Sequence, residues 1–255
     1  MKLVNISIVA LSVFMMISTP VDAQEKKAAP VPKKNLFKIN LTSLPLSNYG
    51  FQYERAMSKH LSIALGYRTM PLGNIPLKDN IVSLANGDAN MQKTLDQLLI
   101  SNTAITPELR WYPGRKGYGR GFYVAPFIRF ASFHGEGITI NFSKASGGTD
   151  NISLSGDLTS RTAGLLLGAQ WSLGKHICLD WQIIGPHIGS GTGSLTGTSN
   201  FTLVSSEQTA ITDALKSISF PNVNTSAQVT SNSIKLSMTG PWAGIRAGIS
   251  LGIKL

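Results

Sequence analysis

WAGIRAGISLGIKL, residues 242–255, ends the chain with two kinds of side chain in alternation. Ile245, Ile249 and Leu251 stand among its aliphatic positions, and the alternate positions from 244 to 254 hold glycine, serine or the cations Arg246 and Lys254. Successive side chains of a β-strand point to opposite faces, so the stretch predicts a strand with one apolar and one polar face. The polar face is rich in glycine and light in charge, which does not suit the outside of a water-soluble sheet. It favours an inside-out strand, with lipid against the aliphatic face and polar groups inside.

The same alternation recurs in seven other stretches of the sequence. They are LFKINLTSL (36–44), NYGFQYERA (48–56), HLSIALGYR (60–68), TAITPELRWY (103–112), GFYVAPFIRFASF (121–133), RTAGLLLGAQWSL (161–173) and HICLDWQIIGPHIG (176–189). Each has about nine residues or more, the length that a tilted strand needs to cross a bilayer. We therefore predict an all-β fold, an eight-stranded antiparallel transmembrane β-barrel with long external loops that contain short helices.

The connections between these stretches support that topology. The links at 57–59, 113–120 and 174–175 are short, whereas those at 70–102, 134–160 and 190–241 are long. Outer-membrane barrels have short periplasmic turns and long external loops, so both chain ends are expected on the periplasmic side. Residues 88–101 and 206–218 have the spacing of short amphipathic helices that pack on the barrel mouth or a neighbouring loop. Residues 137–158 are expected to extend the strands as a hairpin.

The start of the chain has the layout of a secretory signal peptide. Lys2 precedes an apolar run over 3–17, and a small-residue end at Ala23 predicts cleavage after that residue, so that 1–23 is the signal peptide. Residues 24–35 are rich in Ala, Pro and Lys and predict a flexible basic leader, followed by a single β-barrel domain over 36–255. The expected location is the outer membrane of a Gram-negative bacterium. One cysteine allows no internal disulfide, so packing or lipid must hold the fold together.

The charge of the chain has a pattern that this topology explains. The formal net charge is +10, although only 14% of the residues are charged. Nucleic acid is not the expected partner of an exported protein. The cations gather in the leader and in the predicted periplasmic turns, at Lys59, Arg115, Lys116 and Lys175 among others. Membrane lipids with anionic headgroups are the simplest partner for them, and an anionic cell-wall polymer is an alternative.

The remaining charges fall mostly on the predicted inward face. An eight-stranded barrel is just wide enough for side chains to fill it, and a buried charge without a partner is costly. We therefore predict an interior network in which carboxylates pair with arginines: Glu54, Arg68, Glu108, Arg110, Arg129, Asp180 and Arg246. Its simplest interpretation is a polar core, with no catalytic residue, metal or cofactor.

Several stretches taken together resemble the small outer-membrane β-barrel proteins of Bacteroidetes, a family of unknown function. They are YGFQYERAMSKHLSIALGYR (49–68), ELRWYPGRKG (108–117), FYVAPFIRF (122–130), LDWQIIGPHIG (179–189) and AGIRAGISLGIKL (243–255). The resemblance covers most of the mature chain and has no defining catalytic motif. It implies the fold and the location. The chain departs from the common barrel pattern by ending in Leu255 and not in an aromatic residue.

Three functions remain open at this point, and a structural or interaction protein whose external loops meet protein or glycan partners is favoured. One alternative is an enzyme that modifies lipid A at the external rim, with His134 or His187 as general base. Glu136 and Ser190 follow these histidines closely in the chain. The other alternative is a narrow channel through an interior lined by small residues.

The segment CLDWQIIGPHIGSGTGSLTG (178–197) contains residues found in metal sites and phosphate-binding loops, but it lacks the full set that either site needs. His176 and Cys178 are too few ligands for a zinc ion. The glycines from 189 to 197 lack the lysine of a phosphate-binding loop. The alternation places Cys178, Asp180 and Gln182 inward, with Trp181 and Ile183 facing lipid.

Overall fold

The alternating stretches close into a ring in the computed structural model, which describes residues 33–84, 89–145, 147–217 and 222–255. Lys33–Leu255 form one compact unit. The predicted signal peptide and most of the predicted leader lie outside the described residues. No helix among the residues described is long and apolar enough to cross a membrane.

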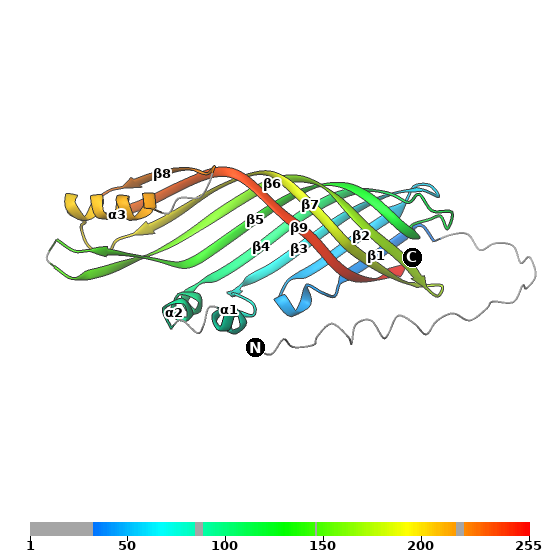
Figure 1. Ribbon diagram of the computed structural model, residues 1–255, viewed down its shortest axis with the longest axis horizontal. Helices are drawn as coiled ribbons and strands as arrows, with labels where there is room; N and C mark the ends of the chain where they lie inside the picture. The colour runs from blue at the N-terminus through cyan, green and yellow to red at the C-terminus, as the bar shows by residue number, and fades with distance from the viewer. Residues whose placement is uncertain (1–32, 85–88, 146, 218–221) are drawn as a thin grey trace, which may run out of the picture. The chain divides into compact units, whose positions relative to one another are not determined.

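The protein is all-β, and eight of its strands form a closed antiparallel ring, as predicted. Each strand pairs with the next along the chain, β7 pairs with β9, and β9 pairs with β1 (Figure 1). The strands of the ring are β1 (Asn35–Asn40), β2 (Tyr49–Ala56), β3 (Leu61–Asn74), β4 (Leu99–Trp111), β5 (Gly121–Ser143), β6 (Thr149–Leu173), β7 (Ile177–Thr198) and β9 (Ser233–Lys254).

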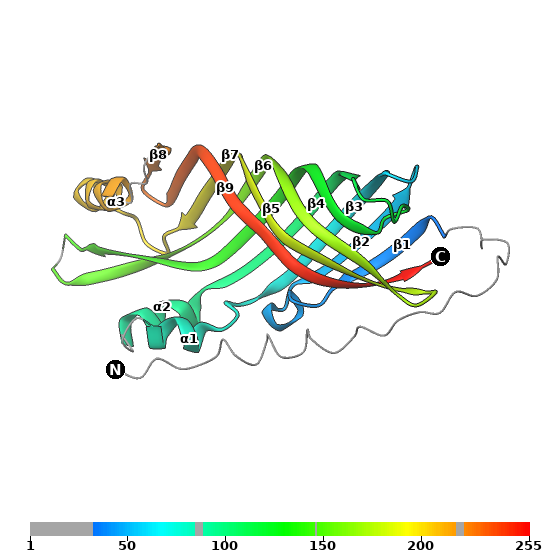
Figure 2. The same cartoon turned by 45° about the vertical axis from the view of Figure 1, so that its right-hand side comes forward.

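Both described ends of the chain lie at one end of the ring, because Leu36 of β1 pairs with Lys254 of β9. We call this the terminal end and the opposite end the loop end. The short links 57–60, 112–120 and 174–176 turn at the terminal end, whereas 75–98 and 199–232 are at the loop end. The predicted long link 134–160 is mostly strand, since β5 and β6 continue as a hairpin (Figure 2).

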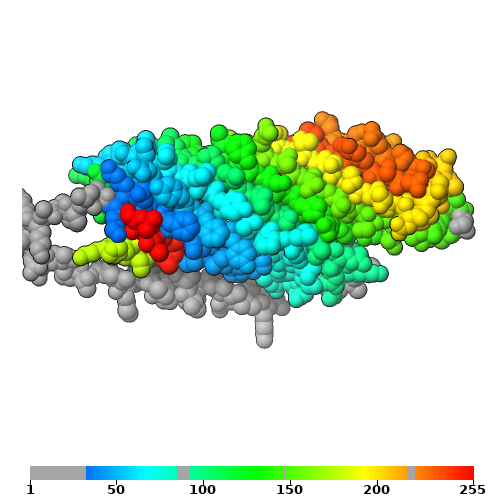
Figure 3. Space-filling view, turned by 180° about the vertical axis from the view of Figure 1, so that it is seen from behind, coloured from blue at the N-terminus to red at the C-terminus, as the bar shows by residue number. Residues whose placement is uncertain are grey.

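The two faces of the strands are those that the alternation predicts. On β9, Ile245 and Ile253 are exposed on the outer face, whereas Ser250 and Gly252 are buried on the inner one. On β3, Leu65 keeps 54% of its surface exposed, while Ala64 beside it keeps 6%. Figure 3 shows the outer surface over β1–β4 together with the C-terminal end of β9. The ring is thus apolar outside and polar inside.

The wall of the ring is incomplete beside β9, which was not predicted. β1 has six residues and β2 has eight, so the expected minimum of about nine was wrong for both strands. After Leu41, whose N–H donates to the Ile249 carbonyl at 2.8 Å, the chain turns through the short helix η1 (Leu44–Leu46). β7 pairs with one edge of β9, and β1 and β8 (Asn224–Val229) pair with parts of the other edge. Within the described residues, no strand pairs with that second edge from Gly240 to Gly248. We call this opening the β9 gap.

A bulge corrects the predicted faces of β7. The register between β7 and β9 shifts between Gln182 and Gly185, and an extra residue in one strand changes which side chains face outward. Ile184 is 44% exposed on the outer face, whereas Ile183, predicted to face lipid, is half-buried. Cys178, Asp180 and Gln182 face inward as predicted.

The loop end carries three helices and one further strand. α2 (Ala89–Gln97) lies within the first segment predicted to be helical, and α3 (Ser205–Ser217) matches the second to within one residue at its start. α1 (Lys78–Leu84) and β8 (Asn224–Val229) were not predicted. β8 pairs with the loop-end part of β9 and is not one of the eight strands of the ring.

α3 packs on the extended strands and completes a second hydrophobic core, which we call the loop-end core. Ile211 and Leu215 of α3 are fully buried, and they belong to one cluster with Phe142 of β5, Leu154 of β6 and Leu236 of β9. The predicted packing of this helix against neighbouring loop-end elements is confirmed. The loop end is therefore a packed structure with a core of its own.

Candidate functional site

The middle of the ring holds a cluster of buried charges, which alternation along four strands places on the inner face. We call Lys38 (β1), Glu54 (β2), Glu108 and Arg110 (β4) and Asp180 (β7) the ion cluster. Every member is at most 4% exposed. Charges removed from water to this extent are stable only when they are paired and fully hydrogen-bonded.

Asp180 accepts hydrogen bonds from both buried cations of the cluster. Its Oδ2 accepts hydrogen bonds from Lys38 Nζ at 2.6 Å and from Arg110 Nη1 at 2.7 Å. Its Oδ1 accepts a hydrogen bond from the Tyr123 hydroxyl at 2.8 Å. Both carboxylate oxygens are therefore satisfied without water.

Glu54 has the corresponding arrangement on the opposite side of Lys38. Its Oε2 lies 2.5 Å from Lys38 Nζ and 3.1 Å from Arg110 Nη1. Its Oε1 accepts hydrogen bonds from the Ser62 hydroxyl at 2.6 Å and the Tyr112 hydroxyl at 2.8 Å. Two carboxylates and two cations thus form a closed, neutral arrangement across the ring.

Glu108 links the ion cluster to the next layer toward the loop end. Its Oε2 accepts hydrogen bonds from Arg110 Nε at 3.0 Å and Nη2 at 2.9 Å, a two-pronged contact that fixes the guanidinium plane. Its Oε1 accepts a hydrogen bond from Arg246 Nη2 at 2.7 Å. Gln52 Oε1 takes a further Arg110 N–H at 2.8 Å.

Two glycines leave space for the neutral partners of the cluster. A Cβ at Gly168 would lie 2.4 Å from the Tyr123 hydroxyl oxygen, so only glycine lets this ring reach Asp180. Gly119 has a φ of +65°, a conformation that other residues rarely adopt. Its carbonyl accepts a 2.6 Å hydrogen bond from Gln170 Nε2, while Gln170 Oε1 lies 2.5 Å from Lys38 Nζ.

Three further arginines form a separate layer toward the loop end, which we call the arginine layer: Arg68 (β3), Arg129 (β5) and Arg246 (β9). Arg68 donates to Asn102 Oδ1 at 2.8 Å, and Arg129 Nη1 lies 3.4 Å from the Thr106 hydroxyl. Among the described residues, neither has a carboxylate within ion-pair distance. The prediction that both arginines pair with carboxylates was wrong, because Lys38, Arg110 and Arg246 already occupy the three acids.

Lys38 is the member of the site that the interior prediction omitted. Its ammonium group contacts Glu54, Asp180 and Gln170. The signal was present in the sequence, since the alternation of LFKINLTSL places Lys38 on the same face as Asn40. It faces inward between Gln52 of β2 and Gly252 of β9.

Of the residues proposed for an enzyme, His134 and Glu136 are in contact, whereas His187 and Ser190 point to opposite faces of β7. His187 faces inward, where its ring packs edge-on against Phe127 at 5.9 Å between centroids, and Ser190 is exposed on the outer face. His134 lies at the loop-end rim, with Nε2 at 3.1 Å from Glu136 and Nδ1 at 2.8 Å from Asp157. Hydrogen bonds to Glu136 and then to Asp157 raise the pKa of His134 above its ordinary value.

His176 and Cys178, the pair considered as zinc ligands, form no metal site among the residues described. Cys178 is fully buried beside Gly252, and His176 is exposed in the turn before β7. Across that part of the chain, no three His, Cys, Asp or Glu side chains are grouped so as to hold a metal ion.

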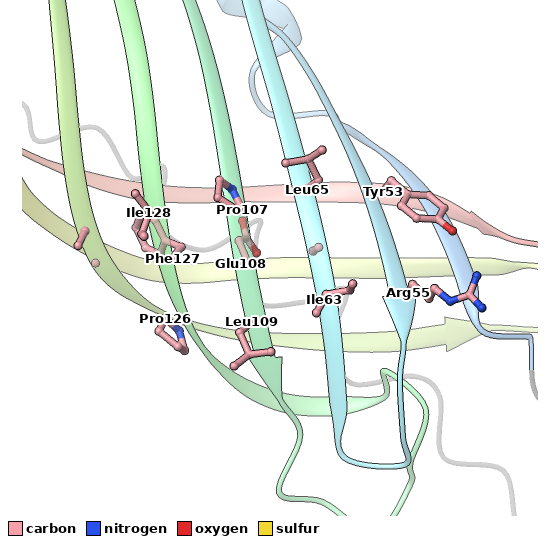
Figure 4. A pocket seen from close by; sticks show the side chains of 13 residues that line it. Tyr53, Arg55, Ile63, Leu65, Pro107, Glu108, Leu109, Pro126, Phe127 and Ile128 are labelled. Atoms are coloured by element: carbon pink, nitrogen blue, oxygen red, sulfur yellow. The ribbon is translucent and has the colours of Figure 1, made fainter.

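A hollow of about 680 Å³ lies on the outer face over β2–β6 (Figure 4). Pro107 and Pro126 line it from adjacent strands, Leu109 lies between Pro126 and Ile63, and Arg55 lies near its edge. Proline has no N–H for the strand ladder, and the pairing of β4 with β5 is interrupted here. The hollow has mainly aliphatic walls and belongs to the apolar outer face.

Fold and site together define a closed eight-stranded antiparallel ring with a charged interior and an apolar exterior. Comparison of the chain with protein-family models and with curated proteins finds no match. The resemblance to the outer-membrane barrels of Bacteroidetes stays a prediction.

Proposed function

We propose that the chain is an integral outer-membrane protein. In this proposal the ring spans the bilayer as a β-barrel with a packed polar interior, and the loop end presents a folded surface to partners outside the cell. The terminal end faces the periplasm. A protein or a glycan is the expected partner at the loop end.

The inversion of polarity carries this proposal. Ile63, Leu65 and Tyr67 of β3 are each more than 45% exposed. Many other aliphatic and aromatic residues around the ring are exposed as well, whereas the charged ion cluster is buried. Large exposed apolar surfaces of this kind mark contact with protein or lipid. A surface that runs around a closed ring suits lipid, because strand pairing satisfies the backbone N–H and C=O groups of the ring outside the β9 gap.

The height of the apolar surface also supports a membrane. On β6 the stretch from Ala163 to Leu173 has no charged residue, and Arg161 lies just before it on the outer face. That stretch is about as long as the 9–11 residues of a spanning strand. At the terminal end, Lys59, Arg115 and Lys175 are exposed in the short links, where they suit anionic lipid headgroups.

Fractionation of cells that express the chain tests the location. We expect the protein in outer membranes, and we expect its migration on gels to change between unheated and boiled samples, because a folded barrel resists detergent. Recovery in the soluble fraction without a heat-dependent shift would refute the proposal.

The orientation can be tested with single cysteines, because the native Cys178 is fully buried and gives no background. Ser143→Cys at the loop end should react on intact cells with a maleimide that does not cross membranes. Lys59→Cys at the terminal end, the matched control, should react only after the outer membrane is permeabilised. The reverse pattern contradicts the proposed topology.

A further inference from the structure

The arginine layer surrounds a cavity that no side chain of the ring fills. The cavity has a volume of about 130 Å³ and is lined from seven strands of the ring. Arg68, Arg129 and Arg246 line it, together with the polar residues Gln52 and Gln182. A single water molecule needs only about 10–15 Å³ by this kind of measure, so the space admits a group of several atoms.

The charges around the cavity do not balance. Without Lys254 at the end of β9, the ring interior holds the cations Lys38, Arg68, Arg110, Arg129 and Arg246 against the anions Glu54, Glu108 and Asp180. Glu54, Glu108 and Asp180 are already paired with Lys38, Arg110 and Arg246. An excess of two positive charges therefore remains in the arginine layer. Buried cations without a partner are strongly unfavourable, and a bound anion removes that cost.

The arginine layer also has unused hydrogen-bond donors. Arg68 Nε and Arg246 Nη1 are buried and have no hydrogen-bond partner among the described residues. Arg129 is 7% exposed, and its one contact to Thr106 is long at 3.4 Å. Guanidinium groups present pairs of N–H donors that match the oxygens of phosphate. The free donors therefore point to an oxyanion as the missing partner.

The β9 gap gives such a group a way into the cavity. Ile245 and Ala247 of β9 line the cavity on one side, and Phe51 of β2 and Tyr67 of β3 line it on the other. At this level β7 pairs with one edge of β9, and no strand among the described residues pairs with the other edge. The ion cluster fills the ring toward the terminal end, and Phe133 and Trp242, with ring centroids 5.3 Å apart, lie toward the loop end.

We propose that the arginine layer binds one phosphate group through Arg68, Arg129 and Arg246. A phosphate monoester carries a charge of about −1.5 to −2 near neutral pH, which matches the excess of two positive charges. The group comes either from free inorganic phosphate or from the headgroup of a lipid that reaches the β9 gap from the membrane. The chemistry of recognition is the same for both sources.

Binding to the full mature chain in a phosphate-free maltoside detergent tests this proposal. The probes are inorganic phosphate, and phosphatidic acid mixed into the micelles, at constant ionic strength with chloride as the reference anion. Thermal unfolding and titration calorimetry measure the response. We expect phosphate to raise the midpoint of unfolding and to bind one equivalent per chain. A response to phosphatidic acid alone assigns the site to a lipid headgroup.

Variants separate the arginine layer from general charge effects. Arg129→Gln and Arg68→Gln should each weaken binding roughly tenfold or more, because each removes a charge-assisted contact. Without phosphate, Arg129→Gln should be at least as resistant to unfolding as the wild type, since it removes an unpaired buried cation. Arg161→Gln, at an exposed arginine on the outer face, is the control and should leave binding unchanged.

Three results overturn the proposal. The first is no stabilisation of the wild type by either probe. The second is stabilisation that both interior variants retain. The third is an equal loss in Arg161→Gln, which indicates nonspecific attraction to a basic protein. If Arg129→Gln does not fold, Arg68→Gln alone decides between these outcomes.

Discussion

Replacing Asp180 with asparagine removes one charge and leaves the volume of the side chain almost unchanged. Asp180 is fully buried and accepts hydrogen bonds from Lys38 at 2.6 Å, Arg110 at 2.7 Å and Tyr123 at 2.8 Å. The asparagine offers one oxygen and one NH₂ group to three donors, so at least one donor loses its partner. Breaking a buried ion pair by removing one member costs about 3–5 kcal/mol, and we expect a loss of that order in the free energy of unfolding.

Urea unfolding of the mature chain in detergent micelles, followed by the fluorescence of its four tryptophans, measures this loss. Asp157→Asn is the matched control: it removes the same charge from a side chain that is 71% exposed at the rim, where a pair contributes about 1 kcal/mol or less. Adding Lys38→Met to Asp180→Asn should recover part of the loss, because it removes the surplus positive charge that Asp180→Asn leaves in the ion cluster. If Asp180→Asn costs no more than Asp157→Asn, the ion cluster does not stabilise the ring in the way described.

Three other variants test separate parts of the protein. Gly168→Ala should destabilise the fold by displacing the Tyr123 hydroxyl, whereas Gly114→Ala, where a Cβ meets nothing within 4 Å, should be neutral in the same urea assay. Ile211→Ala should cost about 2–5 kcal/mol within the loop-end core and speed hydrogen exchange in α3 and β8 while leaving the ring protected. Glu136→Gln should move the pKa of His134 down toward 6.5 in an NMR titration. Because the folded-state pKa is raised, the contribution of His134 to stability is present below pH 6.5 and is lost as the pH rises through the raised value.

Alternation along each strand predicted the ring and most of the residues that face into it, because the side-chain period of two is a local property of the chain. Glu54, Glu108, Arg110 and Asp180 lie together as expected. Lys38 followed the same rule and was omitted only from the interior network. The bulge that turns Ile184 outward depends on pairing between β7 and β9, which no single strand encodes.

Partners across the ring were harder to predict than faces. Which acid meets which base depends on the stagger of the strands, and this stagger sets the height of each inward side chain along the ring. Arg68 and Arg129 lie nearer the loop end than the carboxylates and do not reach them. α1 and β8 were also missed, because both are short and take their structure from the elements they pack against.

β6 is one strand of 25 residues and pairs with β5 from its loop-end tip to the terminal end of the ring. At about 3.3 Å per residue it is roughly 80 Å long. The same hydrogen-bond ladder thus belongs to the loop-end core and to the ring, with no linker between them. A force applied to the loop-end tip of β5 and β6 would be transmitted along these strands to the ring. A partner that tilts the loop end would therefore exert a torque on the strands around the arginine layer.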